Sequence, residues 1–437
     1  MIDEKLKEYI IEYIEVIDIR FPFEWGGAGS DANNPKTDYS NPYVKIKSNN
    51  IEGVGIGFTL GKGNDLVCAA TDELKTIVVG KSLFELISNF KKYWRLLANP
   101  FQSRWIGPVS GPYYMGAGAI ANGLFDLWAK IEGKPLWELI SELETDDILN
   151  LLDIRYVSHI ISETEIRELL DNAYPTIQER KQKVIDQGLP CYYTTWIGTS
   201  IEDLIIQIEN VIIERGIKDF KFKIGSNLND DIKRLKAIRE HFGNSINIMT
   251  DSNQVWSVNE SIEWMVALKE FNITWIEEPI APDLIDGHKI IKNALAKYNI
   301  DVVTGENCPN SHVAAQLISS SAVSRFQIDA CRVIGPAENI LIMLIAKKFN
   351  VPICPHAGGS GLDELVPHLS AWNYIRLNAN QENVLIEQVG FCSEFFINPS
   401  QVENGHVLLS SQPGYIVGMP DSVIEKYKFR NEEKSYE

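Results

Sequence analysis

Two lysines separated by one residue stand near the middle of the chain, in the segment FKFKIG at residues 220–225. Side chains alternate along a β-strand, so Lys221 and Lys223 share one face of the strand and Phe222 takes the other. Such a lysine pair either meets solvent or faces something that needs positive charge. Two ammonium groups at one site disfavour protonation, so one lysine of such a pair can be neutral and act as a base near pH 7.

Three carboxylates follow, each at the end of a strand-like run. Asp251 ends INIMTD, Glu277 lies in ITWIEE, and Glu306 ends DVVTGE. Carboxylates brought together repel one another, and a hard divalent cation with oxygen ligands relieves that repulsion, so Mg²⁺ is the expected metal. The alternative is a set of salt bridges to Lys221 and Lys223, which leaves a net negative group.

An acid and a histidine end the next two strand-like runs. Asp329 lies in RFQIDA, His356 ends VPICPH, and Glu387 lies in a last run, NVLIEQ. A carboxylate beside an imidazole sets its tautomer and basicity. A cation with a lysine on one side and an Asp–His pair on the other fits proton abstraction next to a carboxylate. The cation stabilises the enediolate, and the opposite acid acts on the group that leaves or returns.

The elements that must position these groups alternate strictly from about residue 191. Eight strand candidates and seven helical segments predict a parallel (β/α)8-type barrel or a close variant. The strand candidates are CYYTTW, DFKFKI, INIMTD, ITWIEE, DVVTGE, RFQIDA, VPICPH and NVLIEQ. The carboxyl ends of barrel strands share one mouth, so ionisable residues at seven successive strand ends meet there. Any one of them alone is more typical of a solvated turn.

Three parts of the chain differ in pattern. Residues 1–150 mix strand-like runs with helical segments at 73–97 and 119–133, which predicts an α+β domain. Within it, the polar loop of residues 26–42 is long, and such loops are functional or disordered more often than structural. Residues 151–392 form the barrel part. Residues 393–437 lack the βα pattern, and we expect them to pack back on the first domain.

Composition limits the partners of the chain. Its 41 basic and 59 acidic residues give a net charge of −18, which disfavours nucleic acids and anionic membranes. The six cysteines form no CxxC pair, so a reducing compartment is the simpler setting. No stretch approaches the roughly 18 apolar residues of a membrane span, and the first residues do not resemble a signal peptide. We therefore expect a cytoplasmic protein with a small-molecule ligand.

Taken together, these motifs resemble the mandelate racemase group of the enolase superfamily, and most closely its L-fuconate dehydratases. The resembling segments include IRFPFEWGGAGSDANNPKTDYSNPYV, RWIGP, KFKIG, DSNQVW, WIEEP, TGENC, QIDACR and CPHAGGSGL. The resemblance implies an α/β fold with an enolase-type (β/α)7β modified TIM barrel and an amino-terminal α+β capping domain. It also implies a homo-oligomeric, Mg²⁺-dependent hydro-lyase of carbohydrate catabolism, which converts L-fuconate to 2-keto-3-deoxy-L-fuconate and water.

The resemblance further implies roles for single residues. The Mg²⁺ ligands are Asp251, Glu277 and Glu306. Lys223 removes the C2 proton, and Lys221 contacts the substrate carboxylate and lowers the pKa of Lys223. His356, backed by Asp329, assists loss of the 3-hydroxyl, and Glu387 contacts the enediolate oxygen as a protonated acid. Further substrate contacts are implied for Gly29, Ser30, Asp31, Tyr39, Glu306, Ala357 and Gly358.

Three alternatives stay open at this point. The substrate can be another sugar acid, of the galactonate or arabinonate type. The reaction can be epimerisation or racemisation at C2, with Lys223 and His356 as opposed bases, because both reactions begin with the same proton abstraction. The barrel can also serve as a binding protein without catalysis, although facing carboxylates are costly without a cation.

Overall fold

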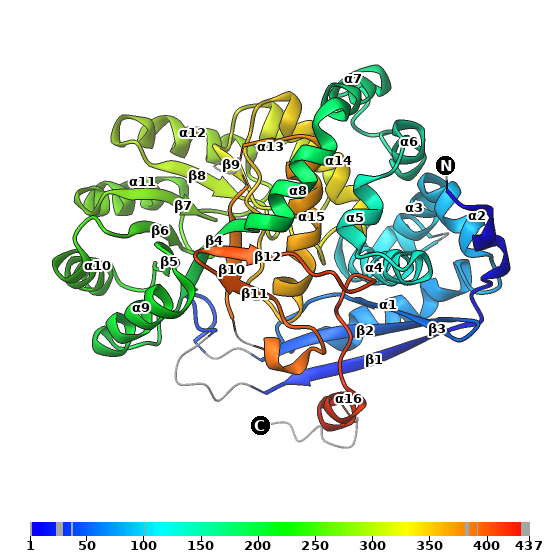
Figure 1. The fold of residues 1–437 in the computed structure, drawn as a ribbon. Helices are drawn as coiled ribbons and strands as arrows, with labels where there is room; N and C mark the ends of the chain where they lie inside the picture. Colours follow the sequence, from blue (N-terminus) through cyan, green and yellow to red (C-terminus); the bar gives the residue numbers. More distant parts are fainter. Residues whose placement is uncertain are drawn as a thin grey trace.

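The computed structural model describes residues 2–22, 29–35, 38–100, 102–380, 384–390 and 392–429. Parts of the expected loop (26–28 and 36–37), Asn383 of the last strand candidate and the tail from residue 430 lie outside these ranges. Figure 1 shows a three-stranded antiparallel sheet beside a barrel of parallel strands. The small sheet consists of β1 (Tyr13–Phe21), β2 (Tyr39–Ser48) and β3 (Ile51–Ile56).

The barrel strands pair in parallel and in chain order. They are β4 (Leu189–Thr195), β5 (Asp219–Lys223), β6 (Asn247–Asp251), β7 (Ile273–Glu277), β8 (Asp301–Thr304), β9 (Arg325–Phe326) and β10 (Ile386–Gln388), which returns to pair with β4. Between β9 and β10 the expected seventh strand makes only one bridge, from Phe326 to Ile353. Pro352 and Pro355 in that segment have no N–H to donate to a ladder, which accounts for its irregularity.

Seven helices alternate with the barrel strands, as the sequence predicts. They are α9 (Ile201–Arg215), α10 (Leu228–Phe242), α11 (Val258–Leu268), α12 (Ile285–Leu295), α13 (Ser311–Ser319), α14 (Gly335–Lys348) and α15 (Leu362–Arg376). Polar N-cap side chains start several of them; Ser200 and Ser257, for example, accept backbone N–H bonds at α9 and α11. No helix in the described part of the chain is long and apolar enough to cross a membrane.

Further helices pack outside this ring. α5 (Leu136–Ser141), α7 (Glu163–Ala173) and α8 (Ile177–Gln187) contact α15, which is therefore buried along its whole length. The helical stretch expected at 73–97 is divided between the end of α1 (Asn64–Leu74), α2 (Leu83–Ser88) and α3 (Phe90–Ala98). α6 (Thr145–Leu151) lies between α5 and α7 in the chain.

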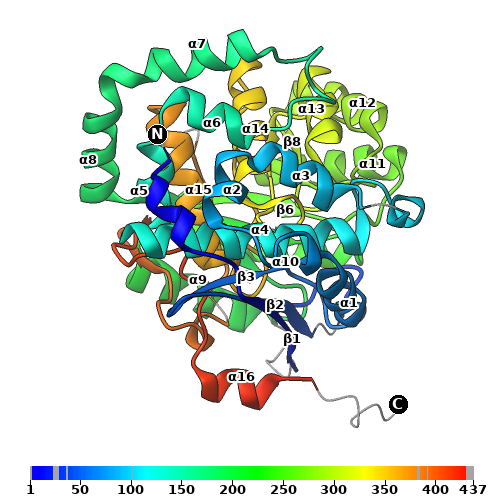
Figure 2. The ribbon, with the colours of Figure 1, turned by 90° about the vertical axis from the view of Figure 1, so that its right-hand side faces the viewer.

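Helix α4 (Gly111–Glu132) joins the small sheet to the barrel (Figure 2). Its glycines and those of β3 allow backbones to approach closely. A Cβ atom added to Gly55 would lie 2.1 Å from the carbonyl oxygen of Ala119, and one added to Gly118 would lie 2.4 Å from that of Val333. Only glycine permits such contacts. The orientation of the small sheet over the barrel thus depends on these missing side chains.

The carboxyl-terminal segment contacts both parts of the molecule. The hairpin of β11 (Gln401–Glu403) and β12 (His406–Leu408) extends the barrel sheet next to β4, which the sequence did not indicate. Farther on, α16 (Asp421–Tyr427) lies against β1 (Figure 1), and the Phe429 N–H donates to the Asp18 carbonyl oxygen at 2.8 Å. The domain boundaries near residues 150 and 392 stay a prediction.

Replacement of Gly55 by Ala tests the close contact between β3 and α4. We expect Gly55→Ala to lower the free energy of unfolding by at least about 1–3 kcal/mol, because the methyl group must displace helix backbone. Urea denaturation followed by circular dichroism measures the change. Gly418→Ala is the matched control, because its Cβ would meet only the Ile397 Cδ1 atom at 3.5 Å. Equal stability of the two variants would contradict the role of Gly55.

Candidate active site and metal centre

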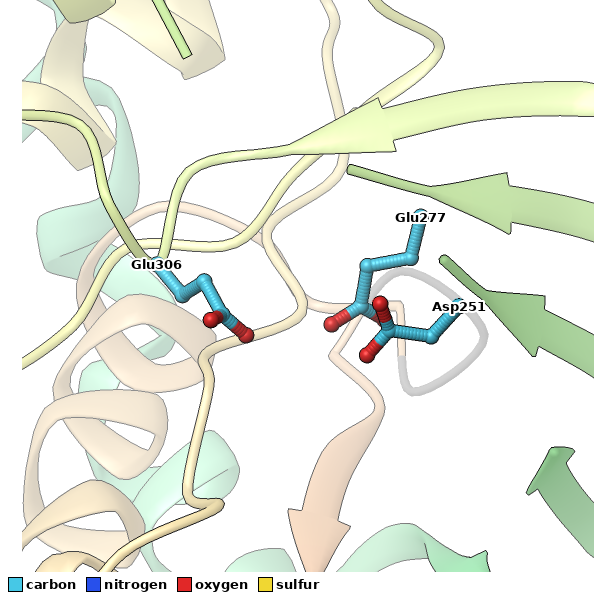
Figure 3. Close-up of side chains that lie close together, drawn as sticks. All are labelled: Asp251, Glu277 and Glu306. Carbon is cyan, nitrogen blue, oxygen red and sulfur yellow. The ribbon is translucent and has the colours of Figure 1, made fainter. Parts of the chain in front are cut away.

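Three carboxylates meet at the carboxyl ends of the barrel strands (Figure 3). Lys223 pairs with Asp251 across β5 and β6, and Asp251 pairs with Glu277 across β6 and β7. Glu306 follows β8, and one oxygen from each of Asp251, Glu277 and Glu306 lies within 4.8 Å of the others. The Oε2 atom of Glu306 is buried and accepts no hydrogen bond. An all-oxygen set of closely spaced carboxylates fits a hard divalent cation.

The two lysines of β5 point into this group of carboxylates. The Nζ atom of Lys221 lies 2.7 Å from oxygens of both Glu277 and Glu387, and 3.4 Å from Asp251. Lys223 forms a short ion pair with Asp251. The expected shared face of the lysine pair is therefore turned inward. The salt bridges that the sequence left open as an alternative are also present in the structure.

The electrostatics around Lys223 differ from the expectation. Burial lowers the pKa of this lysine, and the neighbouring Lys221 lowers it further. The negative charges of Asp251, Glu306 and Glu277 outweigh both effects and raise the pKa above its usual value. The carboxylates facing the pair thus oppose the neutral Lys223 that the lysine pair alone predicts. A neutral Lys223 at the proposed cation site stays a prediction.

The Asp–His pair lies at the same mouth. Asp329 Oδ2 is 2.7 Å from Nδ1 of His356, and Glu306 Oε2 is 3.3 Å from Nε2. When the imidazole is neutral, the Gly358 N–H donates to Nε2 at 3.1 Å. Burial lowers the pKa of His356, but Glu306, Asp329 and Glu387 outweigh burial and raise it to about 10. The protonated imidazole is thus the favoured form beside these carboxylates.

Glu387 on β10 is held on both oxygens. One oxygen accepts a short bond from the Thr194 hydroxyl and faces Lys221, and the other accepts the Ala357 N–H at 2.8 Å. Burial raises the pKa of Glu387, but Lys221 and His356 outweigh it and lower the pKa below its usual value. These charges favour the carboxylate form of Glu387, whereas the protonated acid that the resemblance implied stays a prediction. The backbone N–H of Ala357 thus donates to Glu387, whereas the resemblance implied a contact between Ala357 and the substrate.

A cavity of about 250 Å³ opens over these groups. The expected residues that line it are Asp31, Tyr39, Lys223, Glu306, His356, Gly358 and Glu387. The lining also includes residues that the sequence reasoning missed, namely Asn33, Asn34, Phe58, Leu60, Thr194, Trp196, Asn253, Gln254, Glu278 and Asn307. Most of the missed residues adjoin a strand-end motif, as Asn253 and Gln254 do in DSNQVW, so adjacency to those motifs was the available signal.

The described part of the expected loop closes one side of the cavity. Asp31 accepts the backbone N–H groups of Asn33 and Asn34, each at 2.7 Å, and the Asn33 amide donates to the Asn253 carbonyl oxygen. Ser30 does not line the cavity, and its hydroxyl instead accepts the Gly198 N–H at 2.8 Å, after β4. Gly29 is also absent from the lining. Ser30 thus anchors the loop next to β4, while Asp31 faces the cavity.

The backbone behind the carboxylates is strained. Asn253, Gln254 and Glu278 have φ values of +48°, +68° and +43°, in the left-handed region that non-glycine residues seldom adopt. Glu278 is fully buried, and burial together with the charges of Glu306 and Asp251 raises its pKa well above the usual value. Its carboxyl oxygens accept hydrogen bonds from the Gln254 amide at 2.9 Å and from the Asn307 amide at 3.2 and 3.3 Å.

Comparisons with known proteins agree with this architecture. Residues 203–422 match the family model described as enolase C-terminal domain-like. The chain is 38% identical over 424 residues to mitochondrial enolase superfamily member 1 of Homo sapiens, covering 96% of each protein. It is 37% identical to L-galactonate dehydratase of Hypocrea jecorina, covering 94% of this chain and 92% of that protein.

The structural comparison extends over nearly the whole chain. The crystal structure of the human protein superposes with a TM-score of 0.95, at 37% identity and 98% coverage of both chains. L-Talarate/galactarate dehydratase from Salmonella typhimurium LT2, liganded with Mg and L-lyxarohydroxamate, shares the fold, with a TM-score of 0.75 at 22% identity. The superposition covers 98% of this chain and 95% of that chain. The sequence identity and the matched model show that the chain belongs to the enolase superfamily.

Proposed function

We propose that the chain is a Mg²⁺-dependent hydro-lyase that dehydrates a sugar acid. The observation that carries this proposal is the group of three carboxylates within 4.8 Å, set between Lys223 and the Asp329–His356 pair. The relative named L-galactonate dehydratase, at 37% identity over most of both chains, supports the reaction class. A site with a base and an acid around a cation suits removal of a proton and of a hydroxyl group.

We propose L-fuconate as the substrate. Among the described residues of the lining, the two cationic groups are Lys223 and His356, and both lie at the carboxylate cluster, whereas the described loop residues carry Asp31. A second carboxylate on the substrate would be repelled there, which favours a mono-acid sugar. Phe58 and Leu60 add an apolar wall that suits a terminal methyl group. L-Fuconate is L-galactonate without the terminal hydroxyl, so L-galactonate is the second candidate.

The first step is removal of the C2 proton by Lys223. When bound, Mg²⁺ would supply positive charge to the substrate carboxylate and offset the three carboxylates that raise the pKa of this lysine. Lys221 is 1% exposed and does not line the cavity, so we assign it a role through its ion pairs with Glu277 and Glu387. It keeps both carboxylates in place while Lys223 takes the proton.

The second step is loss of the 3-hydroxyl. The electron pair left at C2 forms a double bond to C3 as the C3–O bond breaks, and protonated His356 delivers a proton so that water leaves. Asp329 holds Nδ1 of the imidazole and directs Nε2 toward the cavity. The resulting enol then takes up a proton at C3 and becomes the 2-keto-3-deoxy acid. Asp31 and Tyr39, from the proposed capping domain, exclude water over the reacting carbons.

Incubation with L-fuconate tests the proposed function. With Mg²⁺ present we expect a semicarbazide-reactive keto acid from L-fuconate and from L-galactonate, and EDTA should abolish its formation. Galactarate should react at least about tenfold more slowly because its second carboxylate meets Asp31. An inverted C2 centre without keto acid would instead identify an epimerase. Absence of turnover with every mono-acid sugar would leave a binding protein.

The base is tested by Lys223→Ala. We expect this variant to lose both dehydration and the exchange of the C2 hydrogen with solvent deuterium, with kcat reduced by at least about 10³-fold. Proton NMR of L-fuconate in D₂O measures the exchange. Persistent exchange at C2 would remove Lys223 from the role of base.

The acid is tested by His356→Asn. Because His356 acts on the leaving hydroxyl, we expect dehydration to stop while Lys223 still exchanges the C2 hydrogen. The same NMR experiment, run beside the keto-acid assay, separates the two steps. A variant that still dehydrates L-fuconate at the wild-type rate would show that another group protonates the leaving hydroxyl.

A further inference from the structure

Each carboxylate of the proposed cation site has one oxygen held by a neutral amide. The bonds run from the Asn253 N–H to Asp251 Oδ1 at 3.0 Å, from Gln327 Nε2 to Glu277 Oε2 at 2.6 Å, and from Asn307 Nδ2 to Glu306 Oε1 at 3.0 Å. The Oε2 atom of Glu306 accepts no hydrogen bond. One oxygen of each carboxylate is therefore held by an amide. The other oxygens of Asp251 and Glu277 are ion-paired to Lys223 and Lys221, and one oxygen from each of the three carboxylates lies within 4.8 Å of the others (Figure 3).

The two side-chain amides are themselves fixed in place. Gln327 is fully buried directly after β9, its backbone N–H donates to the Thr304 carbonyl oxygen at 2.9 Å, and its Nε2 lies 3.4 Å from the Tyr192 hydroxyl. Asn307 lies against both carboxyl oxygens of Glu278, which the Gln254 amide holds from the other side. Gln254 and Glu278, whose side chains make this contact, both have left-handed backbone conformations.

The neutrality of these donors matters for a cation site. A lysine or arginine at the same positions would orient the carboxylates but would also cancel the charge that attracts a divalent cation. An amide N–H fixes a carboxylate oxygen and leaves the net charge of the group unchanged. Outer partners of metal ligands act in this way, and their removal typically lowers metal affinity about 10–100-fold.

We propose that Asn307 and Gln327 are positioning residues of the cation site, which orient Glu306 and Glu277 so that one oxygen of each faces the metal. The proposal rests on the proposed Mg²⁺-dependent function and adds two residues to it. Asn307 is the better test position, because it is half-buried at the cavity and its side-chain amide donates hydrogen bonds only to carboxyl oxygens among the described residues. Gln327 lies deeper in the barrel and serves as the second position.

Calorimetric titration of EDTA-treated protein with MgCl₂ tests the proposal. We expect Asn307→Ala and Gln327→Ala to raise the Mg²⁺ dissociation constant about 10–100-fold. Gln316→Ala is the matched control, because this exposed amide on α13 donates only to the His312 carbonyl oxygen of its own helix. The control should bind Mg²⁺ as the wild type does. The thermal midpoint of Asn307→Ala without Mg²⁺ should stay close to the wild-type value.

A second measurement separates positioning from direct catalysis. In the keto-acid assay, Asn307→Ala should need more Mg²⁺ for half-maximal rate yet recover a kcat within about threefold of wild type at saturating Mg²⁺. Unchanged Mg²⁺ affinity in Asn307→Ala, or a kcat that saturating Mg²⁺ does not restore, would overturn the assignment. If the wild type binds no Mg²⁺, both the Mg²⁺ requirement of the proposed function and the positioning role of Asn307 and Gln327 are refuted. If the wild type binds Mg²⁺ but forms no keto acid, the affinity test still decides the positioning role.

Discussion

The repulsion among buried carboxylates at the barrel mouth is the constraint around which the site is built. Two unit charges 4 Å apart cost about 4 kcal/mol at an effective dielectric constant of 20, and Asp251 and Glu277 are both fully buried. The structure answers this repulsion with Lys221 and Lys223 on one side and with neutral amide donors on the other. One oxygen from each of Asp251, Glu277 and Glu306 still lies within 4.8 Å of the others, and a divalent cation stabilises such an arrangement.

The fold supplies this arrangement through register and close packing. Parallel pairing places Lys223, Asp251 and Glu277 side by side on β5, β6 and β7. The small sheet is held against the barrel by the glycine contacts of α4, and it also contacts the loop that follows His356. Asn41 on β2 donates to the Ser360 carbonyl oxygen at 3.1 Å, only four residues after His356 in the chain. The contacts that attach the small sheet thus also position the loop bearing the proposed acid.

The order of elements could be predicted from the sequence because it depends on local periodicity and on residue types at strand ends. The eight strand candidates and seven helices follow from alternation and amphipathic spacing, and the carboxylates, lysines and histidine stand out because each lies at or near the end of a strand candidate. The helices around α15 and the hairpin β11–β12 were not foreseen, since their stability comes from packing against the barrel rather than from a regular pattern.

By itself the sequence determined the barrel and the chemical types that meet at its mouth, because strand alternation and parallel connection leave few arrangements. Only the tertiary structure decided the electrostatic surroundings of these groups and the supporting contacts, because those depend on distances between residues far apart in the chain. The pKa of Lys223 is raised and that of Glu387 is lowered, both opposite to the expectation from near neighbours and family resemblance. The bonds of Asn307 and Gln327 to the carboxylates likewise exist only once the strands are side by side.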